Sequence, residues 1–170
     1  SSYEELARTL KRFCGAYAVE SEKLFRIIVF NYGFANGDAH LKNFSLLRTS
    51  LGDYILSPAY DLLSTQLHLP HETRLALDLF ADEEYSEGEL SHGFVTGKDL
   101  LELGRRMGLI EHRAAAVLRD FLWHHTEVEA LIDRSFLSPE AKAVYHAIIA
   151  DRRRALILDV PPATLDTTTP

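Results

Sequence analysis

Residues 36–43 read NGDAHLKN and residues 57–64 read SPAYDLLS, and these two segments guide the interpretation of the whole chain. The first carries Asp38 and Asn43 five residues apart, and the second adds another acid, Asp61. Phosphoryl transfer uses such groups in this order. One Asp accepts the proton of the attacking hydroxyl, and an Asn and a later Asp hold the magnesium ions that bridge the phosphates of ATP. The two segments therefore predict a phosphoryl-transfer site.

Each polar residue type in these segments suits one part of that chemistry. In the catalytic loop of protein kinases, the Asn also lies five residues after the Asp. We expect Asp38 to orient and deprotonate a substrate hydroxyl, and Asn43 and Asp61 to bind the cofactor through magnesium, which prefers oxygen ligands. His40 is expected to fix the loop or to neutralise charge near the transferred phosphoryl group. Lys42 is expected to contact a phosphate oxygen as a point charge.

The elements around the two segments are predicted to be helical before them and to form a hairpin between them. Apolar residues at helical spacing predict a helix over Tyr3–Phe13, and Ser21 is a plausible N-cap for a second, largely apolar helix. Residues 44–47 and 54–56 flank a polar turn and predict a β-hairpin that brings the later acid back to the first segment. Alternating leucines over residues 74–80 predict a further strand.

The second half of the chain is predicted to be helical. A capping box at residues 96–99 begins a helix that ends at residue 107. A long helix is expected over residues 111–133, and another from residue 139 to about residue 158, with Pro in its first turn. Residues 161–170 are expected to form a disordered tail.

Composition limits the classes of protein that fit. The hydrophobic content of 46% and charged content of 25% are those of an ordinary globular protein. The formal net charge of −7 argues against direct nucleic-acid binding, and the arginines at residues 152–154 are interpreted as complementing a helix dipole. The single cysteine, Cys14, excludes an internal disulfide and fits a reducing cytoplasm. No apolar run is long enough to cross a membrane.

The motifs resemble those of the HipA family of bacterial serine/threonine kinases. The matching segments are residues 30–31, 36–45 and 56–64, and the order of the later elements is also similar. This resemblance implies a mainly α fold with short β-hairpins over residues 1–160, of the type of a protein-kinase C-terminal lobe without its N-lobe.

The same resemblance implies roles and partners. Asp38 is then the catalytic Asp, Asn43 a magnesium ligand, and Asp61 the counterpart of the metal-binding Asp of DFG motifs. It also implies ATP and magnesium as cofactors, a protein substrate, and an antitoxin with a DNA-binding domain as partner in a toxin–antitoxin system. Upstream of Asp38 we find no glycine-rich loop and no ATP-binding lysine. We therefore expect weak or no activity from the chain alone, and an N-lobe or a split partner chain that completes it. We also expect homodimers through the N-lobe-facing surface.

Other functions stay open. The Gly-Asp-x-His-x-x-Asn order also resembles phosphoinositide-3-kinase-like enzymes, and antibiotic and choline phosphotransferases share Asp-x4-Asn loops. The residues that precede Asp61, SPAY, favour the HipA family over both. A non-catalytic module that docks an antitoxin or an N-lobe partner is a further alternative, and the simplest alternative is that residues 36–38 form only a turn.

Overall fold

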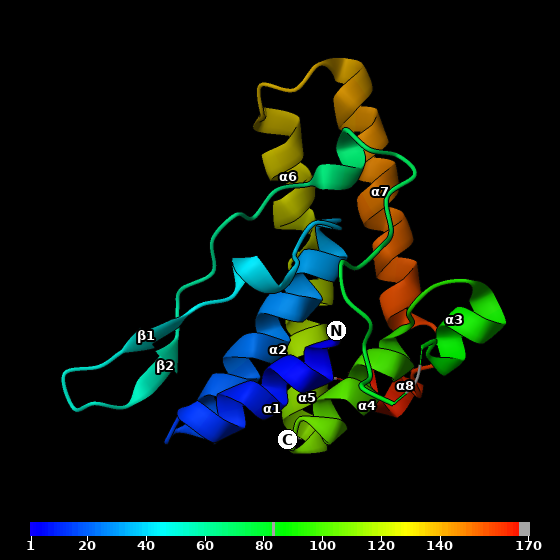
Figure 1. Ribbon diagram of the computed structural model, residues 1–170. Helices are drawn as coiled ribbons and strands as arrows, with labels where there is room; N and C mark the ends of the chain where they lie inside the picture. Colours follow the sequence, from blue (N-terminus) through cyan, green and yellow to red (C-terminus); the bar gives the residue numbers. More distant parts are fainter. Residues whose placement is uncertain (83, 167–170) are drawn as a thin grey trace.

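The computed structural model describes residues 1–82 and 84–166, which are mainly α-helical with one two-stranded hairpin (Figure 1). This confirms the predicted fold class. In chain order the elements are α1 (Tyr3–Phe13), α2 (Tyr17–Gly33), the 3-10 turn η1 (Leu41–Asn43), β1 (Leu46–Arg48), β2 (Tyr54–Leu56), the 3-10 turn η2 (Thr65–Leu67), α3 (Glu87–His92), α4 (Gly97–Arg106), α5 (Glu111–Trp123), α6 (His125–Arg134), α7 (Pro139–Ile157) and α8 (Pro162–Leu165).

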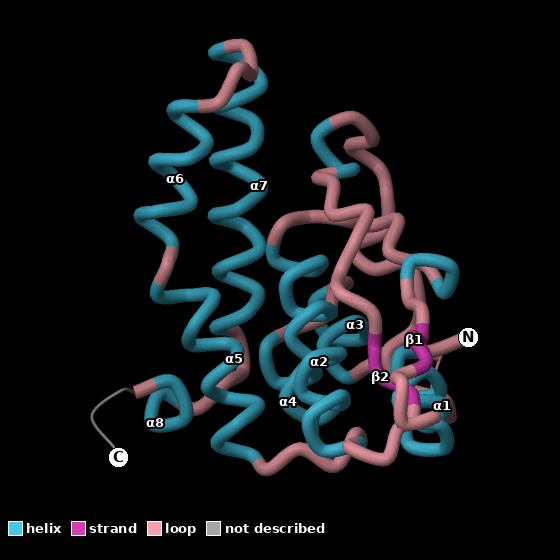
Figure 2. Tube along the Cα trace, turned by 90° about the vertical axis from the view of Figure 1, so that its left-hand side faces the viewer, coloured by secondary structure: helices cyan, strands magenta, loops and turns pink. Residues whose placement is uncertain are grey.

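Helix α2 is the centre of the core. Its side chains Leu24, Phe25 and Ile28 are fully buried, because α1, α5 and α7 all pack against it. Figure 2 shows α5, α6 and α7 on one side of α2, and α1 with the hairpin on the other. At the end of α2 a Cβ on Gly33 would lie 2.3 Å from the ring of Phe121, so the absence of a side chain lets α5 approach closely. Each large apolar side chain buried in this way contributes about 1.5–3 kcal/mol.

The hairpin pairs β1 with β2 in antiparallel register, with Leu46 opposite Leu56 and Arg48 opposite Tyr54. A buried carboxylate fixes it to α2: Glu20, only 2% exposed, accepts the N–H of Leu56 at 2.8 Å. The end of β2 is therefore held against the central helix at the point where the chain continues towards Asp61.

Several predicted elements differ from the observed ones. Helix α2 begins at Tyr17, so Ser21 is not its cap; its hydroxyl is buried inside the helix and donates to the Ala18 carbonyl. The strand predicted over residues 74–80 is absent. This segment forms one isolated bridge, between Asp78 and Ser2, and its leucines pack on the largely helical core instead.

The C-terminal helices also differ in part from prediction. The capping box at residues 96–99 and the Pro-initiated helix α7 are confirmed. The predicted long helix over residues 111–133 is interrupted at His124, whose ψ of 20° separates α5 from α6. Part of the predicted tail is ordered, because α8 packs on α5 and the Thr164 carbonyl accepts from Arg119 at 2.9 Å. Residues 167–170 of that tail lie outside the described residues.

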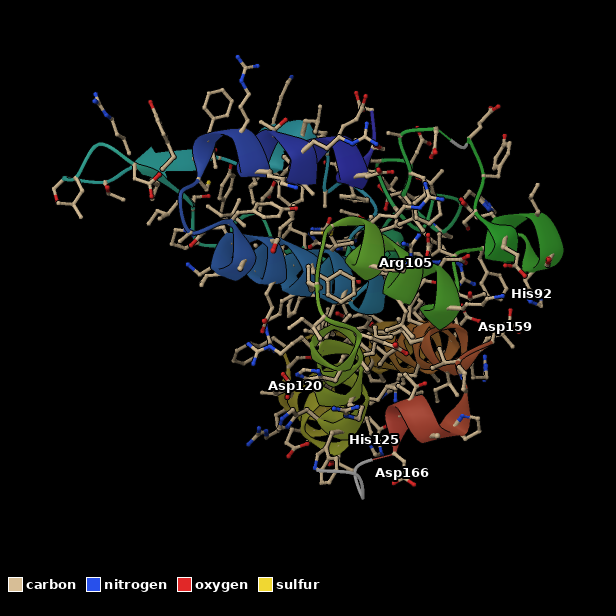
Figure 3. The ribbon with its side chains drawn as sticks, turned by 90° about the horizontal axis from the view of Figure 1, so that it is seen from below. His92, Arg105, Asp120, His125, Asp159 and Asp166 are labelled. Atoms are coloured by element: carbon tan, nitrogen blue, oxygen red, sulfur yellow. The ribbon has the colours of Figure 1, made fainter. Side chains whose placement is uncertain are left out.

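A polar contact joins the end of the short helix α3 to the chain that follows α7. His92 at the end of α3 and Asp159 after α7 lie beside one another, with Nε2 and Oδ2 2.9 Å apart (Figure 3). Within the described parts of the chain, no helix is both long and apolar enough to cross a membrane.

Candidate functional site

The turn that follows α2 carries the candidate base. The chain leaves the helix through Ala35, whose φ is +60°, and the Asn36 N–H donates to the Asn31 carbonyl at 2.8 Å. The next residues reach the surface, where the side chains of Asp38 and His40 are 63% and 46% exposed. Nε2 of His40 lies 3.9 Å from Oδ1 of Asp38. Both groups are therefore accessible to a substrate.

The two candidate metal ligands meet directly. Nδ2 of Asn43 donates to Oδ2 of Asp61 at 2.6 Å. Oδ1 of Asn43 is buried, and among the described residues it has no hydrogen-bond partner. A buried carbonyl oxygen without a donor is costly, and a cation is one of the few groups that can satisfy it.

The hairpin brings these residues together. Beyond β1 and β2 the ladder continues with the Ser57 N–H donating to the Ser45 carbonyl at 2.8 Å. The phenol of Tyr60 then donates to the Lys42 carbonyl at 2.7 Å and lies 2.8 Å from the Ser45 hydroxyl. The segment that carries Asp61 is thus bound to the turn that carries Asn43, while Lys42 itself is exposed in η1.

The segment that follows Asp61 packs on the turn of the candidate base. The Thr65 hydroxyl accepts the Gly37 N–H at 2.8 Å, and the Gln66 N–H donates to the Ala35 carbonyl. A Cβ on Gly37 would lie 2.4 Å from the Thr73 carbonyl oxygen, so only glycine permits this approach. Residues 65–73 therefore help to hold the turn in place.

These residues fit magnesium only as part of a larger set of ligands. Asn43 and Asp61 offer hard oxygen donors, but Mg²⁺ requires six. In residues 1–82 and 84–166 no group of three or more His, Cys, Asp and Glu could hold a metal ion. The two side chains fit an ion whose remaining ligands come from phosphate groups and water.

A largely apolar groove of about 440 Å³ runs beside the site, between α2 and the segment after β2. Ile27 and Phe30 form one wall, and Pro58 and Leu62 form the other. Leu62 directly follows Asp61, so an occupant of this groove would touch the segment that carries Asp61.

The family model of the HipA-like C-terminal domain matches residues 1–128. The chain belongs to this family. It is 29% identical over 145 residues to a protein of Haemophilus influenzae named "Putative kinase", covering 80% of this chain and 42% of that protein. It is 40% identical over 73 residues to "Putative kinase Y4dM" of Sinorhizobium fredii, covering 41% of this chain and 18% of that protein.

A solved structure shares the fold. It is the complex of HipA, HipB and operator DNA from a toxin–antitoxin system of Shewanella oneidensis MR-1, with a TM-score of 0.69 and 22% identity. The match covers 92% of this chain and 36% of that one. The chain thus spans less than half the length of each of these three proteins.

All five candidate residues lie on the two segments that the sequence singled out. The structure brings Asn43 and Asp61 into direct contact and places His40 beside Asp38. Sequence reasoning assigned Asn36 only to a turn, although its side chain is 3% exposed and bonds to the main chain on both sides of the site. In the sequence, the one feature that could have pointed to Asn36 is its position directly before Gly37 and Asp38.

Proposed function

We propose that the chain is the C-terminal catalytic part of an ATP- and magnesium-dependent serine/threonine protein kinase of the HipA-like family. The observation that carries the proposal is the contact of Asn43 with Asp61, together with the buried Asn43 oxygen that lacks a donor. Magnesium bound there would neutralise charge on the phosphates of ATP. The relatives named as kinases support the proposal.

Asp38 would accept the proton of the substrate hydroxyl. A carboxylate on an accessible, hydrogen-bonded turn can approach a protein side chain without moving the fold, which is the positioning that phosphoryl transfer requires. His40 lies close enough to orient that carboxylate or to stabilise nearby negative charge. Lys42, in the next turn, would contact a phosphate oxygen.

The chain alone should bind ATP weakly. Its proposed ligands hold the metal, but positioning of the phosphates in kinases also uses a lysine and a glycine-rich loop. We therefore propose that activity needs an N-lobe, either in the same protein or as a separate chain. The neighbour of known structure is described in complex with HipB and operator DNA, which supports an antitoxin with a DNA-binding domain as a further partner.

The test is transfer of radioactive phosphate from ATP to protein, in a protein that joins this chain to a nucleotide-binding lobe. Asp38→Asn and Asp61→Asn should each abolish transfer, while Asp53→Asn at the far end of the hairpin should retain it. A lipid or sugar substrate in place of protein, or full activity of Asp38→Asn, would contradict the proposal.

A second candidate is a docking module without catalysis, favoured by the apolar groove beside Leu62. Under that function Phe30→Glu in the groove would abolish partner binding, and Asp61→Asn would leave the partner's affinity and every measured activity unchanged.

A further inference from the structure

The carboxamide of Asn36 joins three segments of the site. Its Oδ1 accepts the Asp38 N–H at 3.3 Å, and its Nδ2 donates both to the Asp61 carbonyl and to Oδ1 of Asn31, each at 3.1 Å. If the carboxamide of Asn36 were rotated by 180°, its NH₂ group would face the Asp38 N–H, and its oxygen would face the Asp61 carbonyl oxygen and Oδ1 of Asn31. The partners therefore fix its orientation.

Asp61 has a backbone conformation that non-glycine residues seldom adopt. Its φ of +56° lies in the left-handed region, which Asp tolerates better than most residues but which needs contacts to hold it. Its carbonyl is held by Asn36, and its carboxylate is held by Asn43 at 2.6 Å. Loss of the Asn36 donor would let the backbone relax and carry the carboxylate away from Asn43.

We propose that Asn36, oriented by Asn31 of α2, is a positioning residue that holds the metal-binding acid Asp61 in fixed relation to the base Asp38. Asn36 acts through the main chain of both residues and contacts no substrate. The inference rests on the proposed function, because it takes Asn43 and Asp61 as metal ligands. It identifies the buried amide pair as the link between the central helix and the reacting groups.

The experiment is a Mn²⁺ titration of the protein that joins this chain to a nucleotide-binding lobe, with a non-hydrolysable ATP analogue present to supply the phosphate ligands. It is monitored by the paramagnetic broadening of the amide signals of residues 43 and 61. Asn36→Asp keeps the oxygen that accepts the Asp38 N–H but replaces the donor to Asp61 with an oxygen. It should need about tenfold more Mn²⁺ for the same broadening, which corresponds to about 1.4 kcal/mol. Asn31→Leu should act in the same direction, whereas Asn31→Asp, which retains the acceptor, should stay within about twofold of the wild type.

A matched control separates positioning from general stability. Ser86→Ala removes a buried hydroxyl that caps α3 and touches neither segment, so it should lower the unfolding temperature and leave the titration unchanged. If Asn36→Asp does not fold, the Mn²⁺ titrations of Asn31→Leu and Asn31→Asp test the inference in its place. Titrations that match the wild type in Asn36→Asp or Asn31→Leu would overturn the inference.

The proposed function can fail separately. If the wild type shows no broadening at residues 43 and 61, the assignment of these residues as metal ligands is wrong. The positioning role of Asn36 is then tested by the backbone conformation of Asp61. In Asn36→Asp the Cα and carbonyl chemical shifts of Asp61 should lose their left-handed pattern. Unchanged shifts would refute the role of Asn36 whether or not metal binds.

Discussion

Removal of the buried carboxylate of Glu20 should destabilise the protein and release the hairpin. In the wild type the N–H of Leu56 donates to the Glu20 carboxylate at 2.8 Å. In Glu20→Ala this buried N–H is left without an acceptor. Loss of a hydrogen bond to a charged group costs about 1.5–3 kcal/mol. The ion pair to Lys23 adds little, because the lysine side chain is 51% exposed. The expected loss is about 2–3 kcal/mol.

The assay is urea unfolding combined with calorimetry. For a domain of this size each kcal/mol lowers Tm by roughly 2–4 °C, so Glu20→Ala should melt about 4–12 °C below the wild type. Hydrogen exchange in β1 and β2 should accelerate more than exchange in α5. Glu20→Gln retains an acceptor for Leu56 and should lose less than about 1 kcal/mol. A loss below about 1 kcal/mol in Glu20→Ala would refute the reasoning.

Three further predictions concern the turn, the charge network and a helix cap. Gly37→Ala should cost about 1–3 kcal/mol in urea unfolding, because its Cβ would meet the Thr73 carbonyl; an unchanged midpoint would contradict this packing. The hydrogen bond from Arg105 lowers the pKa of Glu102 to about 2, so its contribution to stability is complete above pH 4.5 and is lost as pH falls towards 2. The stability gap between wild type and Glu102→Gln should shrink over that interval, and a constant gap would exclude the pair. Ser138→Ala should cost about 1 kcal/mol by removing the N-cap of α7, and calorimetry should show no loss if the cap is unimportant.

Local signals predicted the elements that depend on local chemistry. The helix over Tyr3–Phe13, the hairpin and the capping box at residues 96–99 follow from periodicity, a polar turn and side chains that satisfy the first N–H groups of a helix. The convergence of Asn43 and Asp61 was also predictable, because a short hairpin must return the chain to where it began.

Errors arose where tertiary packing outweighed a local pattern. Ser21 is a common capping type, but here it is buried within α2 and satisfied by a carbonyl one turn back. The alternating leucines over residues 74–80 have no neighbouring strand to pair with in the described parts of the chain, so their periodicity reflects burial against helices.

Arg152 shows the limit of reasoning from charge runs. The sequence suggested cations that complement the dipole at the end of a helix. Arg152 is instead 1% exposed, lies 4.9 Å from the centre of the Tyr32 ring and donates to Gln66. The partners of a buried arginine come from distant segments, so neighbouring residues in the sequence cannot identify it. The same reason concealed Asn36, whose role depends on contacts to Asp61.

The most direct test of the central claim is the position of a metal ion in crystals of the protein that joins this chain to a nucleotide-binding lobe, grown with Mn²⁺ and a non-hydrolysable ATP analogue. Anomalous scattering should show manganese within bonding distance of both Oδ1 of Asn43 and the Asp61 carboxylate. A manganese site that contacts neither side chain, or carboxylate and amide groups that bind separate ions, would contradict the account.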